Sequence, residues 1–346
     1  MKNIILLILV FLFFQKANCQ KQLYKTAIVA FYNLENFYDT IHNPAINDTE
    51  FFPNSEKHYN TAVYLTKTSH LATVISQIGT DVNADGPALL GVAEIENDTV
   101  LNDLINEPAL LKRHYHFIHY DSPDPRGVDV ALIYNPKYFT VDTSYRLRVK
   151  LQSGKYYFFT RDILYVKGKL NGETVHILVN HWPSRLGGEQ RSEGSREAAA
   201  AIAKKQIDLI LKNDSTAKII LMGDLNDDPV NASVAKVLGA KANMADVKQN
   251  DLYNPWVDLY KKGIGTIAFG DAWGLFDQII LSYEWLDKKQ DGFFFYQPHV
   301  FNKDFMMENT GRYKSYPMRT WDGNNYRGGY SDHFPSYIIL LKRVIE

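Results

Sequence analysis

Cysteine is almost absent from this chain: its 346 residues include one, Cys19. A single cysteine cannot form a disulfide framework, so core packing must hold the fold together. An excess of charge of one sign is missing too, since 38 Lys and Arg stand against 39 Asp and Glu. The chain therefore has no global attraction to nucleic acid or to an anionic membrane, and recognition of a polyanion must come from local patches.

Long hydrophobic runs are also missing, apart from one at the N-terminus. Residues 4–14 are apolar throughout, but a bilayer-spanning helix needs about 20 such residues. Small residues follow, in the pattern of an export signal. We expect residues 1–19 to be a signal peptide cleaved after Cys19, which gives a mature protein that begins at Gln20 and is secreted or periplasmic. The alternatives are a retained anchor and a lipid on Cys19, although Lys16 fits a lipoprotein signal poorly.

Internal repeats, low-complexity segments and flexible linkers are absent after residue 20, so a single domain over residues 20–346 is the simplest organisation. Helical patterns occur between apolar, β-branched segments, one closing at Gly79 and one beginning at a capping Ser195. This alternation predicts an α/β fold with a mixed sheet or two packed sheets covered by helices. Predicted strands begin at Thr26, Ala88, Val128, Thr174, Lys218, Phe276 and Pro335.

Polar side chains of one chemical kind lie at the ends of most predicted strands. Because strand ends can meet at one rim of a sheet, these side chains can converge although they are far apart in sequence. Carboxylates, carboxamides and imidazoles suit a hard divalent cation and proton transfer around a phosphate. They are Asn33, Glu35, Glu94, Glu96, Asn180, His181, Asp224, Asn226, Asp332 and His333.

Seven motifs occur in order between about residues 26 and 342. They are FYNLENFYD with Asn33, GVAEIEN with Glu94, RGVDVALIY with Asp129, VNHWPSR with His181, GDLNDDP with Asp224 and Asn226, FDQIILS with Asp277, and YSDHFPSY with Asp332 and His333. Together they resemble the endonuclease/exonuclease/phosphatase superfamily, which includes pancreatic-type deoxyribonucleases, abasic-site endonucleases, neutral sphingomyelinases and inositol polyphosphate phosphatases. The resemblance implies a four-layered α/β/β/α sandwich with two packed mixed sheets.

The resemblance also implies a metal site. Glu94 matches the principal metal-binding carboxylate, with Asn33 beside it and Asp332 as a further ligand. An oxygen-rich set of this kind suits Mg²⁺, which is often held by one or two carboxylates plus substrate phosphate oxygens, and Mn²⁺ could substitute. The lack of cysteine ligands argues against a structural zinc site. Asn33 and Glu35 could instead be turn residues, and Glu96 is a weaker candidate.

Catalytic roles follow from the same resemblance. Asp224 would position or deprotonate the attacking water, and Asn226, on the same face in a period-two pattern, would contact phosphoryl oxygens. His181 would contact the scissile phosphate or assist the leaving group, with Asp277 fixing its ring. His333 would be a second imidazole on the phosphate, and which histidine acts as the acid is open. The alternative for each is a hydrogen-bonded structural residue or a cap.

Arginines are candidate phosphate ligands because the guanidinium fork matches phosphate oxygens. Arg161 and Arg185 are the predicted phosphate-binding residues, and the weaker candidates are Arg126, Arg191 and Arg196. The alternative for any of them is a solvated surface charge. Asp227 and Asp228, which precede a proline, are interpreted as loop and cap residues.

Two segments favour a polyanionic substrate. Residues 137–169 are rich in Lys and Arg around Tyr156 and Tyr157, and residues 311–333 interleave arginines with aromatics, a composition suited to base stacking with phosphate pairing. A packed lid is the alternative for the second segment. We find no lipid-headgroup or inositol motif, and we expect no long exposed apolar hairpin of the kind a membrane lipase inserts.

The sequence therefore predicts a secreted, divalent-metal-dependent phosphodiesterase that uses water as the nucleophile, with an extracellular nuclease acting on DNA or RNA as the favoured interpretation. The alternatives are a phosphomonoesterase and a member of the sphingomyelinase or inositol-phosphate phosphatase type. A binding module on an inactive scaffold is disfavoured by the intact Glu94, Asp224 and His181. Neither stable membrane insertion nor a protein partner is expected.

Overall fold

The structure is a computed structural model, and it describes residues 22–153 and 155–344. The predicted signal peptide, residues 1–19, and the predicted mature N-terminus at Gln20 lie outside these residues. Within the described part of the chain, the helices are all too short or too polar to cross a bilayer.

Two mixed β-sheets form the centre of the molecule. The first has the strand order β16 (Phe294–Val300), β19 (Ser336–Arg343), β1 (Tyr24–Phe37), β2 (Pro87–Ile95), β4 (Asp129–Tyr134) and β3 (His116–His119). The second has the order β11 (Ala240–Lys241), β12 (Leu252–Tyr253), β15 (Asp277–Ser282), β10 (Lys218–Asp224), β9 (Glu173–His181), β8 (Ile163–Leu170) and β5 (Phe139–Leu147). Each of the seven strands predicted from the sequence is present.

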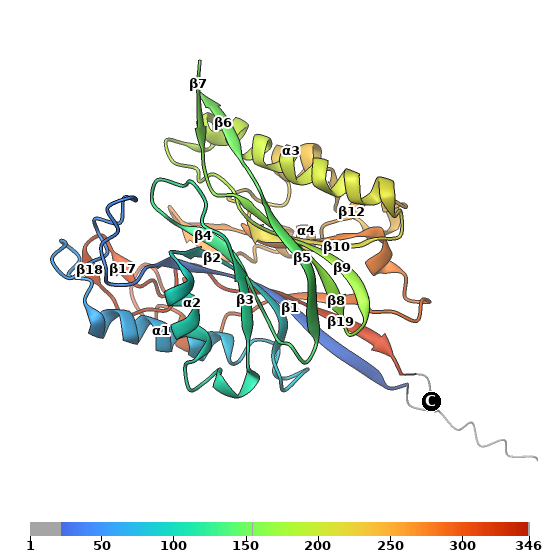
Figure 1. Ribbon diagram of the computed structural model, residues 1–346, viewed down its shortest axis with the longest axis horizontal. Helices are drawn as coiled ribbons and strands as arrows, with labels where there is room; N and C mark the ends of the chain where they lie inside the picture. Colours follow the sequence, from blue (N-terminus) through green and yellow to red (C-terminus); the bar gives the residue numbers. More distant parts are fainter. Residues whose placement is uncertain (1–21, 154, 345–346) are drawn as a thin grey trace, which may run out of the picture.

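Helices cover the outer faces of both sheets, as Figure 1 shows. Helices α1 (Thr61–Ile75) and α2 (Asp98–Ile105) lie on the first sheet, and α3 (Glu189–Asn213) lies on the second, while α4 (Val257–Lys261) is a short connection. Alternate residues of β1 enter two cores: Ile28 packs toward the helices and Val29 packs between the sheets. A third core lies under α3. These four layers confirm the predicted α/β/β/α sandwich.

The two sheets pack closely at Gly91 on β2. A Cβ atom added there would lie 2.5 Å from Sδ of Met222 on β10, so only glycine fits without a shift. This contact lies a few residues before the ends of both strands and sets how closely those ends approach one another.

Two helix boundaries differ from the prediction. Helix α3 begins at Glu189 after Gly188, so Ser195 lies inside the helix and is not its cap. The first turns of α3 are polar, so they lack the regular spacing of apolar residues by which a helix is predicted from sequence. Helix α1 begins at Thr61, capped by the Asn60 side chain, and ends before the turn in which Gly79 adopts a φ of 65°.

No long apolar hairpin was expected, and the structure has a short hairpin with exposed aromatic side chains. Strands β6 (Lys150–Ser153) and β7 (Tyr156–Phe159) form a hairpin that projects beyond the second sheet in Figure 1. All four side chains of β7 are exposed, and Tyr156 is 82% exposed. The hairpin belongs to neither sheet; Leu151 on β6 packs into the core under α3, whereas the side chains of β7 face solvent.

The buried imidazole of His176 on β9 predicts a pH effect on stability. Burial lowers the pKa of His176 to about 4, and Lys167 adds to this effect. Between the ordinary value of 6.5 and about 4 the unfolded chain binds a proton that the folded protein does not, so the free energy of unfolding should fall as the pH drops through this window. His176→Gln, which does not titrate, should show a weaker fall in urea unfolding between about pH 7 and about pH 4.5. Equal pH slopes for both proteins would contradict this prediction.

Candidate active site

Strand register brings three predicted site residues into one row of the second sheet. Asp224, the last residue of β10, pairs with His181 at the end of β9. On its other side Asp224 pairs with Asp277, the first residue of β15. Residues from three motifs therefore lie side by side at one rim of this sheet.

The first sheet contributes Asn33 and Glu94 at the same rim. The pairing of β1 with β2 is irregular after Asn33, and Glu94 adopts a φ of 61°, in the left-handed region. Non-glycine residues held in this region concentrate at functional sites. Oε2 of Glu94 accepts the Asn36 backbone N–H at 2.8 Å, which fixes the carboxylate.

The two rims meet at the Asp224 carboxylate. Nδ2 of Asn33 donates to Oδ2 of Asp224 at 2.9 Å and lies 3.4 Å from Oε1 of Glu94. Nε2 of His181 lies 3.7 Å from Oε1 of Glu94 and 3.7 Å from Oδ2 of Asp224. On the opposite side, Nε2 of His333 lies 3.8 Å from Oδ2 of Asp224. The structure thus gathers these five residues into one cluster.

Asp277 fixes the ring of His333. We had expected it to fix the ring of His181 instead. Its Oδ2 lies 2.7 Å from Nδ1 of His333, and both side chains are buried. The reason is strand order, since β10 separates β15 from β9 and places Asp277 two strands away from His181. Nδ1 of His181 is buried and has no hydrogen-bond partner among the described residues.

The two imidazoles have opposite proton affinities. Burial lowers the pKa of His333, but the carboxylates of Asp277 and Asp224 outweigh it and hold that pKa well above its usual value. Burial, together with the positive charges of Arg161 and Arg126, holds the pKa of His181 well below its usual value. At neutral pH, His333 is therefore charged and His181 neutral, a separation typical of acid and base partners.

Asp224 also departs from an ordinary aspartate. Burial raises its pKa to about 7, with His333 opposing the rise and Asp277 adding to it. A carboxylate poised near neutral pH is suited to accept a proton during catalysis.

The carboxylates present fit a hard divalent cation. Carboxylate oxygens of Asp224 and Asp277 lie within 4.8 Å of one another, and among the described residues Oδ1 of Asp277 is buried without a hydrogen-bond partner. Glu94 brings a further carboxylate to this cluster. Oxygen-rich sites of this kind suit Mg²⁺ or Mn²⁺.

Two predicted metal ligands are held by other contacts. Oδ1 of Asn33 accepts the backbone N–H of Glu35 at 2.9 Å, so the amide turns its Nδ2 toward the carboxylates and acts here as a hydrogen-bond donor. Asp332 lies at the edge of the cluster, with Oδ1 3.9 Å from Nε2 of His333 and Oδ2 3.4 Å from Nη2 of Arg319.

The family model described as the Endonuclease/Exonuclease/phosphatase family matches residues 28–342. The chain belongs to this family. Members of the endonuclease/exonuclease/phosphatase family are metal-dependent hydrolases that act on phosphoester bonds. No curated protein matches the chain in sequence.

Solved structures share the family fold at low identity. A family protein from Bacteroides thetaiotaomicron is 16% identical, with a TM-score of 0.55, and the match covers 93% of this chain and 96% of that chain. TDP2 from D. rerio, solved with a single-strand DNA product, is 13% identical with a TM-score of 0.55, over 91% of this chain and 98% of that chain. At these identities the likeness shows the fold alone.

Asn226 takes a different place in this family member from the one that we expected. Strand β10 ends at Asp224, so the period-two pattern does not reach Asn226, which adopts a φ of 50°. Its backbone N–H donates to Oδ1 of Asp224 at 2.9 Å, and its Nδ2 donates to the Trp182 carbonyl at 2.9 Å. Asn226 thereby orients both Asp224 and the chain after His181.

The two predicted phosphate-binding arginines are engaged with protein groups. Arg161 is buried, where Nη1 pairs with Asp124 at 3.0 Å and Nη2 donates to the Trp182 carbonyl at 2.7 Å. Arg185 pairs with Asp227 at 3.3 Å and with Asp228 at 3.2 Å. Contact of either arginine with substrate phosphate stays a prediction.

Several weaker candidates have structural partners. Arg196 is fully buried and pairs with Asp227, which supports the loop interpretation of that aspartate. The backbone oxygen of Glu35 accepts from Nζ of the buried Lys67 at 2.7 Å. Oε2 of Glu96 accepts from the Asp39 backbone N–H at 2.8 Å. Arg126 pairs with Asp124, with Nε 3.6 Å from Oδ1, and its positive charge helps to lower the pKa of His181.

The contacts of Arg185 predict a structural effect. Arg185→Ala removes the pairs with Asp227, Asp228 and Glu189 and the hydrogen bond from Nε to the Asn226 carbonyl, so the free energy of unfolding should fall by about 1–3 kcal/mol. Arg185→Lys should recover only part of this loss because an ammonium lacks the fork. Thermal unfolding measures the effect. A raised KM that grows with salt, at unchanged stability, would instead support contact with substrate phosphate.

Proposed function

We propose that the protein is a divalent-metal-dependent phosphodiesterase whose substrate is nucleic acid. The observation that carries this proposal is the position of Asp224, which Asn33 holds between a charged His333 and a neutral His181. Hydrolysis by water needs a base, an acid and stabilisation of the phosphoryl oxygens, and these groups supply all three.

Asp224 is the base in this mechanism. It takes a proton from the water whose oxygen forms the new bond to phosphorus, while Asn33 and the Asn226 backbone N–H keep its two oxygens in place. The bond from phosphorus to the leaving oxygen breaks, and the His333 imidazolium, held by Asp277, gives its proton to that oxygen. Neutral His181 can donate from Nε2 to a phosphoryl oxygen.

Glu94, with Asp332 as a further ligand, would hold the metal ion. When bound, a divalent ion polarises a phosphoryl oxygen and stabilises the charge that develops on it.

The projecting β6–β7 hairpin supports nucleic acid as the substrate. Nζ of Lys150 lies 3.9 Å from the ring centroid of Tyr157, and the Arg148 guanidinium lies 5.5 Å from that of Phe159. Exposed aromatic rings beside cations suit stacked bases and their phosphates. The similar fold of TDP2, solved with a single-strand DNA product, supports the same class. Export by the predicted signal peptide would place this activity outside the cytoplasm.

The same hairpin favours a second candidate, a phosphodiesterase that acts on lipid at a membrane surface. Exposed tyrosine and phenylalanine rings flanked by basic side chains also suit the interface of a bilayer. The two candidates differ in what the hairpin contacts, and substrate assays separate them.

The test uses purified protein with Mg²⁺ on single-stranded DNA, RNA, sphingomyelin vesicles and inositol phosphates. We expect the nucleic acids to become shorter without release of inorganic phosphate. Release of phosphate from a monoester would indicate a phosphomonoesterase. Cleavage of sphingomyelin with intact DNA and RNA would overturn the nucleic-acid assignment in favour of the lipid candidate.

A further inference from the structure

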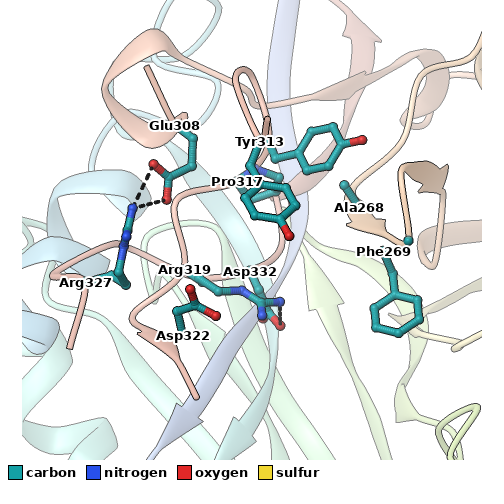
Figure 2. A pocket seen from close by; sticks show the side chains of 11 residues that line it. Ala268, Phe269, Glu308, Tyr313, Pro317, Arg319, Asp322, Arg327 and Asp332 are labelled. Carbon is teal, nitrogen blue, oxygen red and sulfur yellow. Dashed lines mark hydrogen bonds and ion pairs between the residues drawn. The ribbon is translucent and has the colours of Figure 1, made fainter. Parts of the chain in front are cut away.

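A pocket of about 280 Å³, shown in Figure 2, adjoins the candidate active site through Asp332. Asp332, at the edge of the catalytic cluster, forms part of its lining. The remaining walls come from the segment between β16 and β19 and from the hairpin of β13 (Ile267–Phe269) and β14 (Ala272–Gly274). Ile267 pairs with His333, so this hairpin is joined to the catalytic histidine through the backbone.

One side of the pocket is aromatic. Phe269 is 85% exposed and Tyr313 is 52% exposed, so both rings have free surface to offer. Tyr316 is held more firmly, with its ring 5.1 Å from that of Trp273 in an edge-on arrangement. A flat aromatic ligand could stack on these exposed rings and bury the ring surface that now contacts water.

The lining of the pocket carries charges of both signs. Arg319 pairs with Asp332 at 3.4 Å, and Arg327 pairs with Glu308 at 3.3 Å; Figure 2 shows both pairs. Asp322 adds a third carboxylate. Each guanidinium is therefore already compensated, and the lining has more negative than positive groups.

This composition discriminates between ligand classes. A polyphosphorylated ring would meet a net negative lining, and its phosphates would compete with carboxylates for each arginine. An acyl chain would cover charged groups without replacing their hydrogen bonds. A planar heteroaromatic ring can stack on Phe269 or Tyr313 and can both donate to carboxylates and accept from arginine.

We propose that this pocket receives the nucleobase adjacent to the scissile phosphate. The proposal rests on the proposed nuclease function and names the part of the substrate that gives the site its selectivity. The volume lies just below the usual range of small-molecule sites, roughly 300–1,000 Å³, and thus suits one base and not a stretch of oligonucleotide. The pocket is formed in part by the segment that ends in Asp332 and His333. A base bound in the pocket would therefore place the neighbouring phosphate beside His333, and substrates that carry a base at this position would be preferred.

The test compares two single-stranded oligonucleotides that differ at one position, where one carries a base and the other an abasic spacer. Cleavage at the neighbouring phosphate should be faster with the base present. Phe269→Ala and Tyr313→Ala should each lower kcat/KM for the base-bearing substrate by roughly 5- to 150-fold, the range for loss of one stacked base, so that the ratio of the two substrates falls toward one. The matched control is Tyr296→Ala on β16, a 50% exposed tyrosine outside the pocket, which should keep the wild-type ratio.

A binding measurement keeps this proposal separate from the proposed function. Calorimetry should show that wild-type protein binds a nucleoside 5′-monophosphate more tightly than ribose 5-phosphate, and that Phe269→Ala removes the difference. If the protein cleaves neither oligonucleotide but shows this difference in binding, the nuclease function fails and the base pocket stands. Equal binding of the two ligands, or an equal loss on both oligonucleotides in the variants, would overturn the pocket.

Discussion

Asp224→Asn should lower kcat by roughly 10²–10⁴-fold, the usual contribution of a general base. Both carboxylate oxygens of Asp224 accept hydrogen bonds in the structure, Oδ1 from the Asn226 backbone N–H and Oδ2 from Nδ2 of Asn33. An asparagine has one oxygen, so its NH₂ group must face one of these two donors. We therefore expect a second effect, a loss of about 1–3 kcal/mol in the free energy of unfolding. Steady-state kinetics and thermal unfolding measure the two effects.

The matched control for this variant is Asp214→Asn. Oδ1 of Asp214 accepts the Thr216 backbone N–H at 2.9 Å, the same local hydrogen bond that Asp224 makes with Asn226, but in a turn after α3. This control should keep the wild-type kcat. A folded Asp224→Asn protein with near-normal kcat would show that the negative charge at the end of β10 has a structural role and not a catalytic one.

Chelation with EDTA should abolish activity, and Mg²⁺ or Mn²⁺ should restore it. Glu94→Ala should lower activity by more than about 10²-fold at moderate Mg²⁺, since even the loss of a group that only supports a metal ligand costs roughly 10–100-fold. A high concentration of Mg²⁺ should recover part of the loss. Metal that binds the folded protein also stabilises it, so the rise in Tm on addition of Mg²⁺ should be smaller in the variant.

Glu96→Gln serves as the control for Glu94. Both glutamates accept a backbone N–H, at 2.8 Å in each case, but Glu96 bonds to Asp39 and, among the described residues, makes no contact with His181 or His333. It should keep the wild-type response of Tm to Mg²⁺. Full activity of wild-type protein after exhaustive chelation would remove the metal from the mechanism.

The layers of the fold and the rim of the site could be predicted because they depend on local patterns. An apolar strand followed by a polar residue is visible in the sequence, and seven such strands were found. Strand order is not local, so the partner of Asp277 could not be predicted. The exact end of a strand is also hard to read from sequence. Asn226 was therefore predicted to lie on the strand, whereas β10 ends at Asp224.

The basic segment at residues 137–169 shows how composition can mislead. Much of it forms β5 and β8, two neighbouring strands of the second sheet, and these were not predicted. On β5 most side chains are exposed or half-buried, so the strand lacks the apolar alternation of a half-buried sheet. The β6–β7 hairpin between them presents most of the exposed aromatic rings of this segment, and Tyr145 on β5 is also exposed.

The hydrogen bond from Asn33 to Asp224 joins the two sheets, because Asn33 lies on β1 of the first sheet and Asp224 ends β10 of the second. The geometry of the site therefore depends on the relative position of the two sheets. A sliding of one sheet over the other by about 1 Å would break this bond, yet leave both sheets and their helices formed. Gly91 on β2 and Met222 on β10, where the two sheets are in close contact, resist such sliding. Activity in this protein is consequently more sensitive to the packing between the sheets than secondary structure is, and an assay of hydrolysis would detect a misaligned sandwich that circular dichroism would not.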